Sequence, residues 1–252
     1  MLNIPLYLKR IKYTKEVKLN KKTLFELQRR HLKNIPFENL DIHYGKVIKL
    51  DIDSIYTKIV LKKRGGFCYE LNGLFYHLLQ DIGFDVNMIS GRVYRKENSY
   101  TKEYDHLAII ATIENQKYLV DVGFGKFSLN PLEIKFDINT TDDFGKFRFD
   151  RYDVDYLRIN EVINGNLIPQ YIFNTKERKF SEFEFMCKFH QRSKDSHFTK
   201  KKVISIVTKN GRITLNDNQL KITKGKFDKE ILFEEKEFDS KLKEYFDIEI
   251  LK

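Results

Sequence analysis

The chain lacks the sequence features of several common protein classes. It has only two cysteines in 252 residues, Cys68 and Cys187, which argues against a disulfide scaffold. No apolar stretch is long enough to span a membrane, and residues 1–9 lack the basic start and long apolar core of a signal peptide. Zinc-finger spacings and the aromatic motif of RNA-recognition domains are also missing. These absences predict a reduced, cytoplasmic protein that binds neither membrane nor nucleic acid.

The most informative segment is residues 64–72, RGGFCYELN, in which Cys68 follows a Gly-Gly pair. Apolar residues recur after it at steps of three and four, as in one face of a helix: Leu71, Leu74, Phe75, Leu78, Leu79 and Ile82. Gly83 suits the end of that helix. Cys68 therefore belongs in the first turn, where unpaired backbone N–H groups favour an anion and ease ionisation of a thiol. A buried structural cysteine is the alternative, but the context favours a nucleophile.

A nucleophilic cysteine needs a base and a group that orients the base. His106 opens an apolar run, residues 106–111, that is typical of a buried strand. Asp121 lies inside a second apolar run, residues 117–125, where a carboxylate needs a partner such as an imidazolium. Cys68, His106 and Asp121 thus supply a nucleophile, a base and an orienting carboxylate.

The simplest hairpin does not bring the last two residues together. A turn over residues 114–117 places Asp121 opposite Ile110. His106 and Asp121 then share a face of the sheet but are offset by four residues, on the order of 13 Å. A hydrogen bond between them requires a bulge, a strong twist or a different register.

These motifs resemble those of the arylamine N-acetyltransferase family. That family places its catalytic cysteine in an Arg-Gly-Gly-x-Cys-x-Glu-x-Asn segment and its aspartate in a Val-Asp-Val-Gly-Phe-Gly segment, which match residues 64–72 and 120–125. Its catalytic histidine opens an apolar strand, as His106 does. The resemblance extends from about residue 30 to 220 and includes three further segments: residues 35–40, 193–198 and 210–215.

The resemblance implies an α+β fold with a cysteine-protease-like catalytic core. We expect a helical domain over residues 1–83, a β-barrel domain over 84–178 and an α/β lid with an interdomain helix over 179–252. The implied reaction moves an acetyl group from acetyl-CoA through a cysteine thioester to an aromatic amine or hydrazine. It follows a ping-pong mechanism, requires no metal or permanently bound cofactor, and belongs to xenobiotic metabolism. The expected assembly is a monomer or weak homodimer.

The resemblance also assigns residues to roles. The expected catalytic residues are Cys68, His106 and Asp121. The expected substrate-binding residues are Phe37, Phe124 and Gly123. The expected structural supports are Arg64, Glu38 and Asn39, with Arg64 and Glu38 forming an ion pair beside the active-site loop.

Other polar residues are expected to be structural. Glu70 and Asn72 lie within the predicted helix and are expected to brace the site. His31 is expected to be a buried histidine with a hydrogen-bond partner, and Cys187 a core residue. His77 lies on the flank of the apolar stripe with no visible partner.

Patterning also predicts the other elements. Short apolar runs predict strands between residues 85 and 173, with a polar loop at 139–151. The remaining expected elements are helices at 23–31, 53–60 (with Asp53 as a possible cap), 181–191 and 240–246, and strands at 202–207 and 212–215.

The net charge of +10 comes mainly from lysines spread along the chain, with clusters at residues 62–64 and 200–202. A solvated surface explains most of this charge, and the rest could steer a polyanionic cosubstrate such as coenzyme A. Two departures from the family concern substrate contacts: residues 103–105 are acidic and bulky, and no proline lies between Ser193 and Ser196.

Three alternatives remain open. A cysteine hydrolase or transglutaminase-like enzyme would share the Cys…His…Asp order, and a related amide synthase would share nearly all the motifs. A basic nucleic-acid-binding module would need neither Cys68 nor His106, and its affinity would fall steeply with salt.

Overall fold

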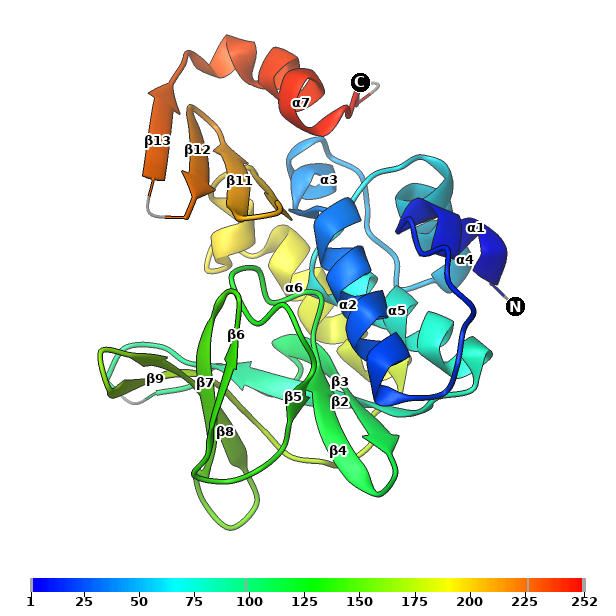
Figure 1. Cartoon of the computed structure of the whole chain (residues 1–252). Coiled ribbons are helices and arrows are strands. Elements are labelled where there is room, and N and C mark those ends of the chain that lie inside the picture. Colours follow the sequence, from blue (N-terminus) through cyan, green and yellow to red (C-terminus); the bar gives the residue numbers. More distant parts are fainter. Residues whose placement is uncertain (1, 98, 226, 251–252) are drawn as a thin grey trace.

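The computed structural model describes residues 2–97, 99–225 and 227–250. Helices from the first third of the chain pack beside an eight-stranded sheet that curls into a nearly closed barrel (Figure 1). A five-stranded sheet and the last helix, α7, lie at the other end of the molecule. The α+β fold expected from the sequence is confirmed. Within the described ranges, no helix is both long enough and apolar enough to cross a membrane.

The helices of the first third surround a shared apolar core. They are α1 (Ile4–Arg10), α2 (Lys21–Asn34), α3 (Leu40–His43), α4 (Ile52–Tyr56), which continues as a π-helical turn (Thr57–Leu61), and α5 (Cys68–Ile82). The apolar stripe of α5 is buried against α2 and the sheet, as the spacing predicted. Gly83 ends α5 with a φ of 108°. The cap of α4 is Asp51, which accepts a hydrogen bond from the backbone of Ser54, so the expectation that Asp53 caps this helix is wrong.

The eight-stranded sheet is antiparallel, with strand order β5-β4-β3-β2-β9-β8-β7-β6. Its strands are β2 (Asp85–Val93), β3 (His106–Ile113), β4 (Gln116–Val120), β5 (Leu132–Glu133), β6 (Asn139–Asp142), β7 (Gly145–Arg151), β8 (Leu157–Ile163) and β9 (Asn166–Phe173). An aromatic cluster fills its interior and includes Phe127, Phe147, Phe149, Tyr171 and Phe173. Residues 139–151, expected to form a loop, instead form β6 and β7. Polar side chains are tolerated there because β6 is an edge strand.

The turn between β3 and β4 corrects the expected register. Glu114 and Asn115 both have positive φ, 50° and 63°, and form a tight two-residue turn. Ile109 therefore pairs with Val120, and Asp121 follows the last paired residue of β4. Continued by one residue, this register places Asp121 opposite Ala108, two residues from His106. The expected turn was two residues too long, so it placed Asp121 opposite Ile110, four residues from His106.

The last third of the chain begins with a 3₁₀ turn (Phe180–Phe183), α6 (Glu184–Arg192) and a second 3₁₀ turn, η3 (His197–Thr199). Four strands and a helix follow: β10 (Val203–Val207), β11 (Gly211–Asn216), β12 (Gln219–Lys224), β13 (Phe227–Leu232) and, after a 3₁₀ turn (Glu235–Glu237), α7 (Phe238–Phe246). The short strand β1 (Phe37–Glu38) pairs with β10, so the first and last thirds share one sheet. The division into domains at residues 83 and 178 stays a prediction.

Candidate active site

Cys68 is the first residue of α5 and lines a cavity of about 450 Å³. The loop before it is fixed by Glu70, whose carboxylate accepts a hydrogen bond from the backbone N–H of Phe67 at 3.2 Å. The side chain is packed among apolar neighbours and Cys68 is only 3% exposed. The sequence placed this thiol correctly at a helix start.

The electrostatics of the thiol differ from the expectation. Burial raises the pKa of Cys68 well above its usual value, and the carboxylates of Asp105 and Asp121 raise it further, while the backbone N–H of Leu107 lowers it. Burial therefore opposes ionisation of the thiol at this helix start.

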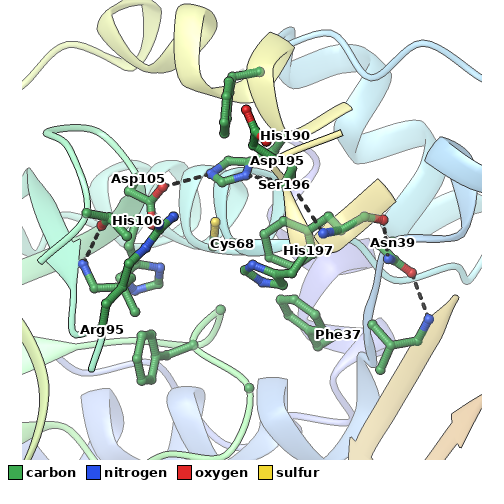
Figure 2. A pocket seen from close by; sticks show the side chains of 18 of the residues that line it. Phe37, Asn39, Cys68, Arg95, Asp105, His106, His190, Asp195, Ser196 and His197 are labelled. Atoms are coloured by element: carbon green, nitrogen blue, oxygen red, sulfur yellow. Dashed lines mark hydrogen bonds and ion pairs between the residues drawn. The ribbon is translucent and has the colours of Figure 1, made fainter. Parts of the chain in front are cut away.

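His106, the first residue of β3, lines the same cavity as Cys68 (Figure 2). Its Nε2 lies 2.7 Å from Oδ2 of Asp121. The imidazole packs edge-on against Phe124, with ring centroids 5.0 Å apart, and against Tyr171 at 5.2 Å. These contacts hold the ring in one orientation, with Nε2 directed to Asp121.

Asp121 is buried and accepts four hydrogen bonds. Its Oδ2 accepts from His106 and from the hydroxyl of Tyr171 at 3.0 Å. Its Oδ1 accepts from Nδ2 of Asn72 and from the backbone N–H of Gly123, both at 2.9 Å. Burial by itself would raise the pKa of Asp121, but His106 and these donors bring the pKa below its ordinary value. The carboxylate is therefore held in its charged form.

Asn72 connects the helix of Cys68 to both strands of the hairpin. Its Nδ2 also donates to the carbonyl of Leu107 at 2.6 Å, and its Oδ1 accepts from the backbone of Val122 at 2.8 Å. The backbone of Gly123 comes so close that a Cβ there would lie 2.8 Å from Cα of Cys68. The bracing expected of Asn72 is present, and a glycine is needed at position 123 for this approach.

Aromatic side chains form much of the cavity wall. Phe37, Phe124 and Gly123, the residues expected to contact substrate, all line the cavity. Phe189 and Phe198, from α6 and η3, add to this wall. Four phenylalanines therefore line the cavity that contains Cys68.

A buried ionic cluster lies behind the loop of residues 62–67. Nε of Arg64 donates to Glu38 at 2.8 Å, forming the expected ion pair, and its Nη2 donates to Asp41 at 2.9 Å. Nζ of Lys58 lies 2.8 Å from both Asp41 and Glu70. Burial raises the pKa of Glu70 to about 6 in spite of Lys58. The cluster fixes the position of the loop that precedes Cys68.

Asn39, expected to be a structural support, joins the first and last thirds of the chain. Its Nδ2 donates to the carbonyls of Phe198 and Lys201, both at 2.9 Å. Its Oδ1 accepts from the backbone of Val203 at 2.8 Å. Since Asn39 also lines the cavity, it holds the segment of residues 198–203 at the cavity wall.

His31 and Cys187 have the buried surroundings expected of structural residues. Nδ1 of His31 lies 3.2 Å from the hydroxyl of Tyr7, and its ring packs edge-on against Phe75. Burial lowers the pKa of His31 to about 3, so it is neutral. Cys187 is buried in the core, and its Sγ accepts a hydrogen bond from Gln191 at 3.3 Å.

Sequence reasoning missed two partners of the site. The hydroxyl of Tyr171 on β9 donates a hydrogen bond to Asp121, which lies 50 residues away along the chain. Nothing in the local sequence distinguishes Tyr171 from other tyrosines in strands. His190 on α6 lines the cavity and contacts Asp105. The acidic segment before His106 was the only sequence signal for this second contact.

The comparisons with known proteins agree with one another. A family model described as N-acetyltransferase matches residues 20–252. Arylamine N-acetyltransferase 2 of Mus musculus is 34% identical over 230 residues, covering 83% of this chain and 79% of the mouse protein. The solved arylamine N-acetyltransferase of Mycobacterium abscessus has a TM-score of 0.90 at 26% identity, covering 99% of this chain and 91% of its own. That of Mycobacterium marinum has a TM-score of 0.89 at 27% identity, covering 98% and 93%. The chain belongs to the arylamine N-acetyltransferase family.

Proposed function

We propose that this protein transfers an acetyl group from acetyl-CoA to an aromatic amine or hydrazine through a thioester on Cys68. The observation that carries the proposal is the shared cavity of Cys68 and His106, with His106 held by Asp121 at 2.7 Å. A thiol, an imidazole and a buried carboxylate in this order are the components of cysteine acyl transfer. Cys68 is the nucleophile, His106 the general base and acid, and Asp121 the residue that orients His106.

In the first half-reaction, the proton of the Cys68 thiol moves to His106. The thiolate attacks the thioester carbonyl of acetyl-CoA, and the tetrahedral intermediate collapses with loss of the coenzyme A thiolate. His106 returns the proton to that leaving group, so free coenzyme A departs and an acetyl-cysteine remains. Because burial raises the pKa of the thiol, the reaction depends on the stabilisation of the His106 imidazolium by Asp121.

In the second half-reaction, a neutral amine attacks the acetyl-cysteine. Aromatic amines and arylhydrazines are weakly basic, so they are largely neutral at pH 7 and need no prior loss of a proton. His106 removes the proton that becomes acidic as the new C–N bond forms, and it returns this proton to the departing Cys68 thiolate. Phe37, Phe124 and Gly123 line the space that the acceptor would occupy.

The lysines near the cavity suit the phosphates of coenzyme A. Lys201 lines the active-site cavity and also a second, more polar cavity of about 670 Å³. Lys200, Lys202 and Lys236 line this second cavity. Lys202 is paired with Asp217 and Glu235, so Lys200 and Lys201 are the better candidates for a phosphate.

The proposal also covers the location, the assembly and the structural residues of the enzyme. We expect a cytoplasmic monomer or weak homodimer that acts on small xenobiotic amines and hydrazines. Arg64, Glu38 and Asn39 are proposed as structural supports, because their contacts fix the cysteine loop and the lid segment.

The test is steady-state kinetics with acetyl-CoA and an aromatic amine, each varied at several fixed concentrations of the other. We expect parallel double-reciprocal lines, the signature of a ping-pong mechanism. Cys68→Ser should abolish transfer, while Cys187→Ala, which changes the other cysteine, should retain it. Intersecting lines, or transfer by Cys68→Ser at the wild-type rate, would refute the proposal.

A further inference from the structure

A second carboxylate–imidazole pair lines the cavity that holds Cys68. Oδ1 of Asp105 lies 3.1 Å from Nε2 of His190, which comes from the last turn of α6. Both residues line the cavity, as His106 does. In Figure 2, the Cys68 sulfur lies between His106 on the left and His197 on the right, with His190 above it. The pair joins Asp105, which immediately precedes His106, to α6.

Asp105 is held as a carboxylate by this contact. It is 9% exposed, and burial by itself would raise its pKa. His190, Thr101 and His106 outweigh burial and bring the pKa of Asp105 below its ordinary value. His190 is 3% exposed, so loss of either member would leave the other buried without its partner.

The contact continues from His190 into η3. Nδ1 of His190 lies 3.0 Å from Oγ of Ser196, and this oxygen also accepts a hydrogen bond from the backbone N–H of Phe198 at 3.2 Å. Ser196 is the N-cap of η3. Both ring nitrogens of His190 thus face protein groups, which favours a positioning role over direct proton transfer with a substrate.

Phe198 is the residue on which these contacts converge. Its carbonyl is fixed from the opposite side by Nδ2 of Asn39 and Nε2 of His43, both at 2.9 Å. Its ring lies 5.1 Å from that of His190, 6.1 Å from Phe37 and 5.9 Å from Phe67, which precedes Cys68. Phe198 is therefore the part of the aromatic wall whose position depends on Asp105, through His190 and Ser196.

We propose that Asp105 and His190 are positioning residues that set the aromatic wall of the cavity and thereby determine how well a bulky aromatic acceptor fits beside Cys68. This inference rests on the proposed function, since it concerns the acceptor of the same reaction. An acceptor without a ring does not use the wall. The pair should therefore affect the choice between aromatic amines and hydrazine more than it affects the chemistry at Cys68.

The test compares Asp105→Ala with Asp105→Asn. The alanine removes the carboxylate that lies 3.1 Å from Nε2 of His190, whereas the asparagine keeps an oxygen in its place and removes only the charge. With Asp105→Ala, we expect the KM for an aromatic amine to rise at least about fivefold and that for hydrazine to stay within about twofold. Asp105→Asn should restore most of the preference for the aromatic amine. Both variants remove the Asp105 charge that raises the pKa of Cys68, so acetylation of Cys68 by an acyl donor without a ring, S-ethyl thioacetate, should change by a similar factor in the two variants.

His190→Ala should raise the KM for the aromatic amine in the same way as Asp105→Ala. The double variant Asp105→Ala/His190→Ala should raise this KM no further than either single variant, because the same contact is lost in all three. Melting temperatures check that the variants are folded. An unchanged preference in both single variants, or an equal loss with both acceptors, would overturn the inference. If the wild-type protein fails to acetylate any amine, the proposed function fails instead, and the two outcomes are thus distinguished.

Discussion

Nε2 of His106 lies 2.7 Å from Oδ2 of Asp121, although the ladder between their two strands ends at the pair Ile109–Val120. Asp121 lies just beyond that pair, where the chain leaves the sheet and Gly123 packs against Cys68. The departure from the ladder lets the carboxylate turn back toward the imidazole. The end of β4 thus brings together the helix of Cys68, the strand of His106 and the orienting carboxylate.

Replacing Asp121 by asparagine should keep the shape of the site but remove its charge. The amide cannot stabilise the His106 imidazolium and favours the wrong tautomer, so kcat/KM for acetyl transfer should fall by about 10³–10⁴. Asp137→Asn is the control, because Asp137 forms a surface ion pair with Arg148. Retention of more than about one tenth of the activity by Asp121→Asn would show that Asp121 does not orient the base.

The hydroxyl of Tyr171 should support catalysis through Asp121. Tyr171→Phe removes one of the four hydrogen bonds to this carboxylate, and a bond to a charged group contributes about 1.5–3 kcal/mol. We expect kcat/KM to fall by about tenfold. Tyr118→Phe, at another buried tyrosine of the same sheet, should leave kcat/KM close to the wild-type value. Equal effects of the two substitutions would assign Tyr171 to packing alone.

Lys58 should be among the largest contributors to stability, because it faces the buried carboxylates of Asp41 and Glu70. Lys58→Met leaves these carboxylates without one of their cations and should lower the free energy of unfolding by about 3–5 kcal/mol. Lys188→Met, which breaks an exposed pair with Glu184, should change it by less than about 0.5 kcal/mol. Urea unfolding measures both. A loss below about 1 kcal/mol for Lys58→Met would contradict the role of the ionic cluster.

His31 should make stability depend on pH. Its folded-state pKa of about 3 lies below the ordinary value of 6.5. Between these two pH values, His31 is protonated in the unfolded chain but neutral in the folded protein. Stability is therefore lost as pH falls from 6.5 toward 3, by up to about 1.4 kcal/mol per pH unit. His31→Gln should flatten this slope in urea unfolding between these pH values. His77→Gln, at a half-buried position on α5, should flatten it much less. An unchanged slope for His31→Gln would contradict the assignment.

The sequence predicted the parts of the site that local patterns encode. The stripe from Leu71 to Ile82 located the helix of Cys68, and an aspartate within an apolar strand indicated a buried partner. The pattern did not encode the turn at Glu114 and Asn115, because a glutamate at positive φ has no sequence signature. A single misplaced turn therefore gave the wrong register and an apparent gap between His106 and Asp121.

Contacts between distant segments could not be predicted. Tyr171 reaches Asp121 only because β9 lies next to β2 in the curled sheet, and no local pattern encodes that pairing. Asp105 and His190 meet because α6 packs over the cavity. The strands β12 and β13 were also not expected, although Leu220 and Ile222 alternate with polar residues in β12; β13 is mostly polar and exposed and lacks this alternation.

The most direct test of the account is the mass of the intact protein after mixing with acetyl-CoA in the absence of an amine. The account predicts a gain of one acetyl group on the wild-type protein and none on Cys68→Ser. The acetyl group should be lost on addition of an aromatic amine, with formation of the acetylated product, and should be labile to hydroxylamine as a thioester. An unmodified wild-type protein whose Cys68 still reacts with an alkylating agent would contradict the acetyl-enzyme.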